Sequence, residues 1–112
     1  MTTISRTEVR EHIEAGTAVA LEALPASYYE DQHLPGALNM PVDEAGQLAP
    51  QLIPDQDSTV IVYCANLPCG NSRTVAAELR RLGYRNVFDY AEGKQGWIEA
   101  GLPVESGTAM AN

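Results

Sequence analysis

The chain has 112 residues, the size of one ordinary globular domain, and 45% of them are hydrophobic. Its 7 Lys+Arg stand against 15 Asp+Glu, and the formal net charge of −8 argues against a nucleic-acid or membrane-surface partner, because both favour a basic face. Two cysteines, Cys64 and Cys69, are too few for a multi-disulfide framework, so the fold has to depend on its hydrophobic core.

A capping box predicts the first helix. Ser5 stands at an N-cap position, and Glu8 stands three residues later, where its carboxylate can reach back to the Ser5 backbone. We expect this helix to end at Gly16, since glycine commonly follows the last helical residue. The brief apolar run at residues 17–21 then predicts a buried strand.

The capping pattern recurs from Ser27 to Glu30 and predicts a second, short helix whose Tyr29 faces inward. The Leu-Pro-Gly sequence at residues 34–36 is typical of a turn. A second short strand is expected over residues 37–40.

The strongest strand prediction covers residues 59–63, a β-branched run. Its continuous apolar character is typical of a parallel strand that is covered on both faces. An apolar stripe at helical spacing begins at Val75 and predicts the next helix, with Ser72 as its N-cap and Gly83 just after its end.

A last strand is predicted over residues 86–90 and a last helix over residues 94–100. We expect Trp97 and Ile98 to face the core and Gly101 to end this helix.

Alternating strands and helices predict a three-layer α/β domain, in which helices flank a central, mostly parallel sheet. One domain is expected over residues 1–105. Residues 106–112 are small and polar, and they are predicted to form a disordered tail.

The compartment affects how the two cysteines are interpreted. The N-terminus lacks the apolar region of a signal peptide, and no segment reaches the ~20 apolar residues that span a bilayer. We therefore expect a cytoplasmic protein, where a close cysteine pair is more often catalytic, redox-active or metal-binding than structural. A zinc site needs four ligands, and His12 and His33 stand at no standard spacing from the cysteines, so no metal is expected.

Cys64 follows the strongest strand directly, and open α/β sheets place their ligand sites at such strand ends. The loop after it leads to a predicted helix N-terminus near Ser72, where free N–H groups and the helix dipole stabilise a thiolate or a bound anion. A cysteine in this position can have a pKa below the free value of ~8.5. The alternatives are that Cys64 is a small core residue, and that Cys69 is a resolving thiol, an alternative nucleophile or a residue without chemistry.

Several segments carry a resemblance to a known family. The stretch at residues 29–37, Tyr-Glu-Asp-Gln-His-Leu-Pro-Gly-Ala, is similar to the pattern Tyr-x-x-Gly-His-Ile-Pro-Gly-Ala, and the strand that ends at Cys64 matches as well. Further matches, in the same order and at suitable separations, are residues 70–73, 82–84 and 93–104. Over residues 4–105 the chain resembles a single-domain rhodanese, a member of the sulfurtransferase family.

The resemblance implies a rhodanese-like fold and a covalent mechanism without a cofactor. Cys64 matches the nucleophile that attacks the outer sulfur of thiosulfate or of a persulfide donor. The resulting cysteine persulfide would lie among loop N–H groups, and a thiol or cyanide acceptor would remove the sulfur. Expected partners are a small sulfur donor or a protein persulfide and an acceptor thiol, without nucleic acid or membrane.

The cysteine loop departs from the family pattern. Ser72 comes eight positions after Cys64 instead of six, so the loop is two residues longer. Pro68 is expected to stiffen the loop, and Gly70 and Asn71 to supply positive φ angles. The whole predicted active-site loop consists of Ala65, Asn66, Leu67, Pro68, Gly70, Asn71, Ser72 and Arg73 around the second cysteine.

The second cysteine leaves the identity of the nucleophile open. Counting back from Gly83 places the family's nucleophile between Cys64 and Cys69. The position at the strand end favours Cys64. A Cys64–Cys69 disulfide, or a persulfide shared by the two, remains an alternative, and oxidation to the disulfide would block sulfur transfer reversibly.

A third departure concerns charge. The family's Asp-Val-Arg after the first strand is replaced by Glu22-Ala23-Leu24, so the salt bridge of that arginine is absent. Arg73 is then the positive charge nearest to the cysteines in sequence. Because thiosulfate is a dianion and the protein is acidic, we favour a thiol-bound or protein persulfide as the donor.

The same residues bear on other functions besides sulfur transfer. A phosphatase loop of the Cys-x5-Arg type does not fit, because Arg73 lies nine positions after Cys64 and four after Cys69. A thiol–disulfide switch of the two cysteines and a non-catalytic binding module remain open. His33 begins the turn before Pro35, and it is expected to hydrogen-bond this turn instead of acting as a base.

Overall fold

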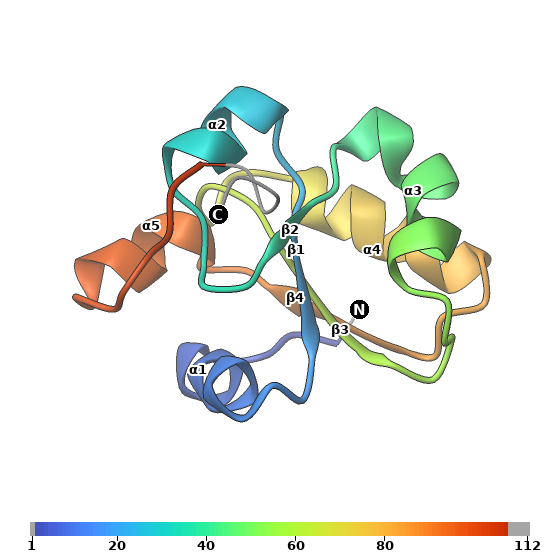
Figure 1. The fold of residues 1–112 in the computed structure, drawn as a ribbon, viewed down its shortest axis with the longest axis horizontal. Helices are drawn as coiled ribbons and strands as arrows, with labels where there is room; N and C mark the ends of the chain where they lie inside the picture. Colours follow the sequence, from blue (N-terminus) through green and yellow to red (C-terminus); the bar gives the residue numbers. More distant parts are fainter. Residues whose placement is uncertain (1, 108–112) are drawn as a thin grey trace.

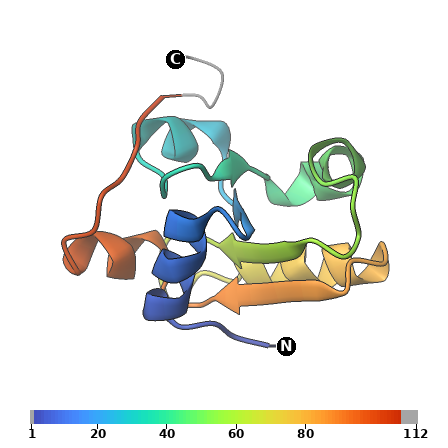
Figure 2. The ribbon, with the colours of Figure 1, turned by 60° about the horizontal axis from the view of Figure 1, so that its bottom comes forward.

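A four-stranded parallel sheet lies at the centre of the computed structural model, which describes residues 2–107 (Figure 1). The strands are β1 (Val19–Glu22), β2 (Leu38–Asn39), β3 (Thr59–Tyr63) and β4 (Asn86–Tyr90), in the spatial order β2-β1-β3-β4. Every pairing is parallel, and Figure 2 shows the arrowheads of β3 and β4 at the same end. The predicted parallel sheet is therefore confirmed.

Helices cover both faces of the sheet. They are α1 (Arg6–Ala15), α2 (Ala26–Asp31), α3 (Ala45–Leu52), α4 (Asn71–Arg81) and α5 (Gly93–Glu99), and a short 3-10 helix (Val42–Glu44) precedes α3. Buried side chains of α3 and α4 pack on one face, and those of α1, α2 and α5 pack on the other. The three-layer prediction is confirmed.

The central strand β3 explains why its sequence is apolar without alternation. Val60 and Val62 pack into the core cluster beneath α3 and α4, while Ile61 and Tyr63 pack into the cluster on the opposite face. Successive side chains of a strand point to opposite faces, so a strand between two helical layers needs an apolar residue at every position.

The predicted start of α1 and the predicted C-terminal glycines of α1 and α4 are confirmed. The Ser5 hydroxyl accepts the Glu8 N–H at 3.2 Å and the Glu8 carboxylate accepts the Ser5 N–H at 3.2 Å, which completes the capping box. Gly16 ends α1 in the left-handed region with a φ of 68°, and Gly83 follows Leu82, the C-cap residue of α4, with a φ of 105°.

Two predicted caps are wrong. α2 begins at Ala26 after Pro25, without a side-chain cap, so Ser27 lies inside its first turn. α4 begins at Asn71 after Gly70, which places Ser72 in the first helical turn with its hydroxyl directed to the cysteine loop instead of to the helix backbone.

Trp97 of α5 is buried as predicted, but Ile98 is 40% exposed, so its predicted inward orientation is wrong. Consecutive residues of a helix point about 100° apart, and a helix as short as α5 buries only one narrow stripe.

The helix α3 is an element that we did not predict. Gly46 and Pro50 lie within it, and both are poor helix formers. Burial of Ala45 and Ala49 against α4 and the sheet stabilises it instead, which is a tertiary effect.

The described chain continues past the predicted domain boundary at residue 105. The Ser106 hydroxyl donates to the Asp31 carbonyl at 2.9 Å, and the Gly107 N–H donates to the Glu30 carbonyl at 2.7 Å. The rest of the predicted tail, residues 108–112, lies outside the described residues. Within residues 2–107, no helix combines the length and the apolar character that a membrane span requires.

Candidate functional site

The cysteine loop leaves the sheet at its topological switch point. From β1 the chain crosses to β2 on one side, whereas β3 and β4 lie on the other side, so the connections diverge at the carboxyl ends of β1 and β3. Ligands of open α/β sheets bind in this crevice. The Ala23 N–H donates to the Tyr63 carbonyl at 2.8 Å there, and Cys64 is the next residue.

Cys64 is buried at the start of the loop, with an exposed fraction of 1%. Its Sγ lies 3.4 Å from the backbone oxygen of Cys69 and 3.6 Å from the hydroxyl oxygen of Ser72. Burial raises the pKa of the Cys64 thiol, and the hydrogen bond to the Cys69 thiol raises it further, while Ser72 acts in the opposite direction. Cys64 therefore keeps its proton at neutral pH.

Cys69 is only half-buried at the far end of the loop. Desolvation raises the pKa of its thiol, but the hydrogen bond from Cys64 and the backbone N–H groups of Asn71 and Ala65 lower it, with help from the charge of Arg73. The net result is a pKa below the ordinary value of a thiol. Cys69 is thus the cysteine that combines access with thiolate character.

The start of the loop rests on the beginning of α5. The Lys94 N–H donates to the Cys64 carbonyl and the Gln95 N–H donates to the Ala65 carbonyl, both at 2.8 Å. Gly93 approaches so closely that a Cβ on it would lie 2.5 Å from the Cys64 carbonyl oxygen, and its φ is +69°. Both facts require glycine at this position.

A buried ion pair lies behind the loop. Glu22 of β1 is 0% exposed; its carboxylate accepts a hydrogen bond from the Tyr63 hydroxyl at 2.8 Å and one from the Lys94 ammonium at 3.0 Å. Tyr63 in turn accepts the Leu34 N–H at 3.1 Å. Burial, and then the Glu22 charge, raise the pKa of Tyr63 well above its usual value, so it remains a hydrogen-bond donor.

The Lys94 ammonium also donates to two carbonyl groups at the end of α2, at 3.0 Å to Tyr28 and 2.6 Å to Gln32. One side chain therefore ties α5 to β1 and α2, while its backbone supports Cys64. The salt bridge expected from the family's arginine has no counterpart at Leu24, but the Glu22–Lys94 pair supplies a different one nearby.

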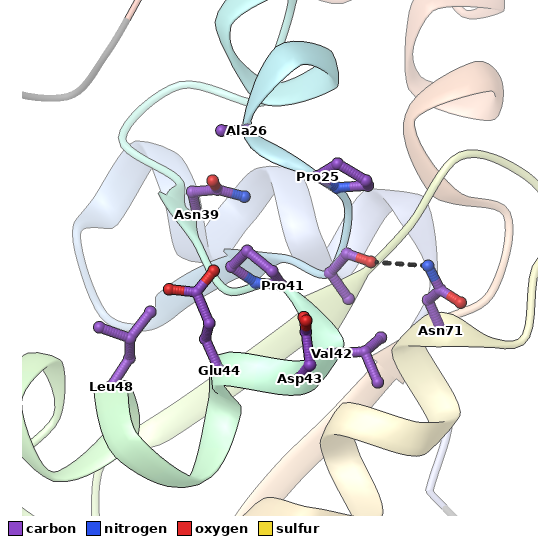
Figure 3. Close-up of a pocket in the computed structure, with 10 residues that line it drawn as sticks. Pro25, Ala26, Asn39, Pro41, Val42, Asp43, Glu44, Leu48 and Asn71 are labelled. Atoms are coloured by element: carbon purple, nitrogen blue, oxygen red, sulfur yellow. Dashed lines mark hydrogen bonds between the residues drawn. The ribbon is translucent and has the colours of Figure 1, made fainter.

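Two acidic hollows lie near the site, one at the first residue of α4 and the other at the loop tip. One cavity of about 510 Å³ borders Asn71, whose amide donates to the Ala23 carbonyl at 3.1 Å, and Figure 3 shows the side chains of Asp43 and Glu44 along it. Another, of about 230 Å³, lies between the loop and α5, and its lining includes Glu92 and Glu99. Such surroundings disfavour a small dianion.

The structure brings together most of the residues that the sequence singled out. Ser72 contacts Cys64, Leu67 and Pro68 are exposed at the loop tip, and Arg73 is exposed beside Cys69. The predicted positive φ angles are wrong, because Gly70 has a φ of −94° and Asn71 is the first residue of α4. The positive φ near the site belongs to Gly93 instead.

His33 lies away from the thiols and has a structural role. Its Nδ1 is 2.7 Å from the Tyr29 carbonyl oxygen, and its ring stacks on the Tyr29 ring with centroids 3.9 Å apart. The ring therefore has a hydrogen-bonding role as expected, but its partner is a carbonyl of α2 and not the predicted turn. Among residues 2–107, no three His, Cys, Asp or Glu side chains gather where they could hold a metal ion.

Sequence reasoning missed the groups that support the loop from behind, namely Glu22, Tyr63, Gly93 and Lys94. The signals were weak: Glu22 stood out only as a departure from the family pattern, and Gly93 and Lys94 only as part of a matching segment. Pairing across 72 residues, as between Glu22 and Lys94, cannot be read from local spacing.

Comparisons with known proteins cover most of the chain. The Rhodanese-like domain matches residues 5–100. The chain is 34% identical over 94 residues to thiosulfate sulfurtransferase GlpE of Actinobacillus succinogenes, covering 84% of this chain and 81% of that protein. It is 30% identical over 109 residues to the HTH-type transcriptional regulator Rv0324 of Mycobacterium tuberculosis, covering 97% of this chain but only 47% of the regulator, about half its length.

Solved structures share the fold of this chain. A thiosulfate sulfurtransferase from Pseudomonas aeruginosa superposes with a TM-score of 0.78 at 28% identity, over 96% of this chain and 20% of that one. The BH2092 protein from Bacillus halodurans superposes with a TM-score of 0.86 at 20% identity, over 94% of this chain and 77% of that one, which supports the fold alone.

Proposed function

The chain belongs to the family of rhodanese-like domains, and from that premise we propose that it is a sulfurtransferase that carries a sulfane sulfur as a cysteine persulfide in the Cys64–Cys69 loop. The observation that carries this proposal is the pair of thiols at the switch point of the sheet, one of which has a lowered pKa. Nucleophilic catalysis by cysteine requires such a thiolate.

The proposed reaction has two stages. A cysteine thiolate attacks the outer sulfur of the donor. The rest of the donor leaves, as sulfite in the case of thiosulfate or as a thiolate in the case of a persulfide. The enzyme then holds Cys–S–S⁻, and the Ala65 and Asn71 N–H groups that lower the pKa of Cys69 also stabilise this anion. Finally a thiol or cyanide acceptor takes the outer sulfur.

Charge favours one class of donor. The carboxylates of Asp43, Glu44, Glu92 and Glu99 line the two hollows beside the loop, and the chain has a net charge of −8. We therefore propose a small or protein-bound persulfide as the preferred donor over thiosulfate, with a thiol as the acceptor. The cytoplasm, which keeps both thiols reduced, is the proposed compartment.

Both cysteines are candidates for the sulfur carrier. Cys64 has the strand-end position that the family resemblance predicts, while Cys69 has the greater exposure and the lower pKa. The prediction of Cys64 as the nucleophile remains a prediction.

A non-catalytic binding role is the second candidate, and the similarity to a transcriptional regulator favours it. In that case the loop would keep its shape without passing on sulfur. The closeness of the two cysteines, with the Cys64 Sγ 3.4 Å from the Cys69 backbone oxygen, keeps a redox switch as a third candidate.

Intact-mass measurement tests the proposal. The reduced protein is incubated with thiosulfate or with glutathione persulfide, the donor is removed, and the intact mass of the protein is measured. Cyanide is then added, and the thiocyanate that forms is measured. We expect sulfane sulfur to be taken up, faster from glutathione persulfide, and the Cys64→Ser/Cys69→Ser double variant to take up none. Absence of both sulfur uptake and sulfide release with either donor, in the folded wild type, would reject sulfur transfer and leave the binding role.

A further inference from the structure

We propose that the two-cysteine loop also reduces the sulfur that it accepts: Cys69 takes the sulfane sulfur, and Cys64 then displaces it as hydrogen sulfide by forming a Cys64–Cys69 disulfide. This rests on the proposed function, because it begins with uptake of a sulfane sulfur. It goes further by assigning different roles to the two cysteines and by adding a sulfide-releasing activity.

The order of events follows from accessibility. A donor in solution has to reach the attacking sulfur, and Cys69 is half-buried at the open end of the loop while Cys64 has an exposed fraction of 1%. The Ala65 and Asn71 N–H groups also favour an anion on Cys69, whether thiolate or persulfide. Cys69 is thus equipped for the first attack and for holding the product.

The second step follows from the contact between the cysteines. The Cys64 Sγ lies 3.4 Å from the Cys69 backbone oxygen, and both side chains pack against the same core cluster. A thiol fixed beside the persulfide reacts as an intramolecular partner, for which effective concentrations are far above those of free thiols in solution.

The chemistry balances in two steps. First, Cys69–S⁻ attacks the outer sulfur of thiosulfate, the S–S bond of the donor breaks, and Cys69–S–S⁻ and sulfite result. Second, the Cys64 sulfur bonds to the Sγ of Cys69, the bond between that Sγ and the outer sulfur breaks, and the outer sulfur leaves as HS⁻. The two cysteine sulfurs are oxidised to a disulfide while the sulfane sulfur is reduced to sulfide.

The proton on Cys64 has a role in the second step. Burial keeps this thiol protonated at neutral pH, so it brings the proton that the departing sulfur needs to become HS⁻. A fresh cycle requires a dithiol reductant, which opens the Cys64–Cys69 disulfide and is itself oxidised to a disulfide.

A single-turnover experiment separates this inference from simple transfer. The wild type is reduced, the small-molecule thiol used as reductant is removed, and one equivalent of thiosulfate is added. Sulfide is trapped with monobromobimane, and the intact mass of the protein is measured. We expect about one sulfide per chain that has reacted, together with a loss of two hydrogens from the protein. A dithiol should then restore the starting mass and make the reaction catalytic.

Variants assign the roles. Cys64→Ser should gain one sulfur, keep it, and release less than a tenth of the wild-type sulfide until a thiol is added. Cys69→Ser should take up little sulfur. Cys64→Ala provides a second test of the resolving position, and thermal unfolding of each variant shows whether it is folded.

The outcomes distinguish the two proposals. No sulfur uptake and no sulfide in the folded wild type, with thiosulfate and with glutathione persulfide alike, would reject the proposed function and this inference with it. A stable persulfide in the wild type, without sulfide or disulfide, would overturn the inference alone and leave sulfur transfer intact. Uptake that survives in Cys69→Ser but is lost in Cys64→Ser would overturn the assigned order.

Discussion

The two ends of the cysteine loop are supported in different ways. At its start, Cys64 is buried, and its carbonyl accepts the Lys94 N–H and lies against Gly93. The Lys94 side chain also pairs with the fully buried Glu22 carboxylate. At its far end the tip residue Leu67 is 64% exposed, and hydrogen bonds such as Cys69 N–H to the Asn66 carbonyl at 3.2 Å are local. The fold thus buries one thiol and leaves the other partly exposed.

Removing the ion pair should have the largest effect on the supported end. Lys94→Met leaves the Glu22 carboxylate buried without a partner, and we expect the free energy of unfolding to fall by about 3–5 kcal/mol. Urea denaturation measures this change. Arg10→Met removes an exposed pair with Glu14 and should leave the midpoint nearly unchanged.

The double variant Glu22→Gln/Lys94→Met sharpens this prediction. With both charges gone, the buried charge left by Lys94→Met alone is removed, and part of the lost stability should return. If the double variant is less stable than Lys94→Met, the penalty arises from packing of the lysine stem and not from the uncompensated carboxylate.

Gly93→Ala should have the next largest effect, since the new Cβ would lie 2.5 Å from the Cys64 carbonyl oxygen at a φ of +69°. We expect a loss of about 2–4 kcal/mol in the free energy of unfolding, and reduced sulfur uptake in the fraction that remains folded. Gly101→Ala is the matched control: its φ is +76°, and nothing lies within 4 Å of the added Cβ. It should lose only about 1 kcal/mol, from the backbone conformation alone. Equal losses would show that the contact with Cys64 is unimportant.

The contrast in reactivity between the two thiols predicts an order of alkylation. The pKa of Cys69 is lowered and that of Cys64 is raised, so as pH increases Cys69 should become a thiolate first. At neutral pH we expect iodoacetamide to modify Cys69 faster than Cys64, since Cys69 is both more ionised and more exposed. Fragmentation mass spectrometry reads the modified position, and faster modification of Cys64 would reverse our assignment.

The smallest effect concerns Arg73, whose exposed guanidinium helps to lower the pKa of Cys69. Arg73→Gln should shift alkylation of Cys69 to slightly higher pH and slow it by about 2–3-fold at neutral pH and low salt. The difference should vanish at ~1 M salt, because an exposed charge is then screened. Arg85→Gln, at the other end of the sheet, should leave the Cys69 rate unchanged.

Local signals predicted the elements that frame the site. The capping box at Ser5, the glycine after α4 and the apolar run of β3 each act within a few residues, so spacing alone identifies them. The helix α3 escaped prediction because it contains Gly46 and Pro50 and is stabilised mainly by its buried alanines.

The candidate site was predicted in part for the same reason. Cys64 and Cys69 could be placed in one loop because a strand precedes it and a helix follows it. The positions of Gly93 and Lys94 against that loop depend on how α5 docks on the sheet, which has no local signature. The φ angles of Gly70 and Asn71 were mispredicted because α4 begins earlier than the expected cap at Ser72.

The Lys94 side chain also bears on the order of folding. Its hydrogen-bond partners Gln32, Tyr28 and Glu22 lie 62, 66 and 72 residues away in sequence, so the contacts can form only after α5 has docked. Contacts of such high sequence separation are slow to form. We therefore expect β3 and both thiols to be in place before the backbone support of Cys64 is complete, so that the geometry of the reactive loop matures as a late event in folding.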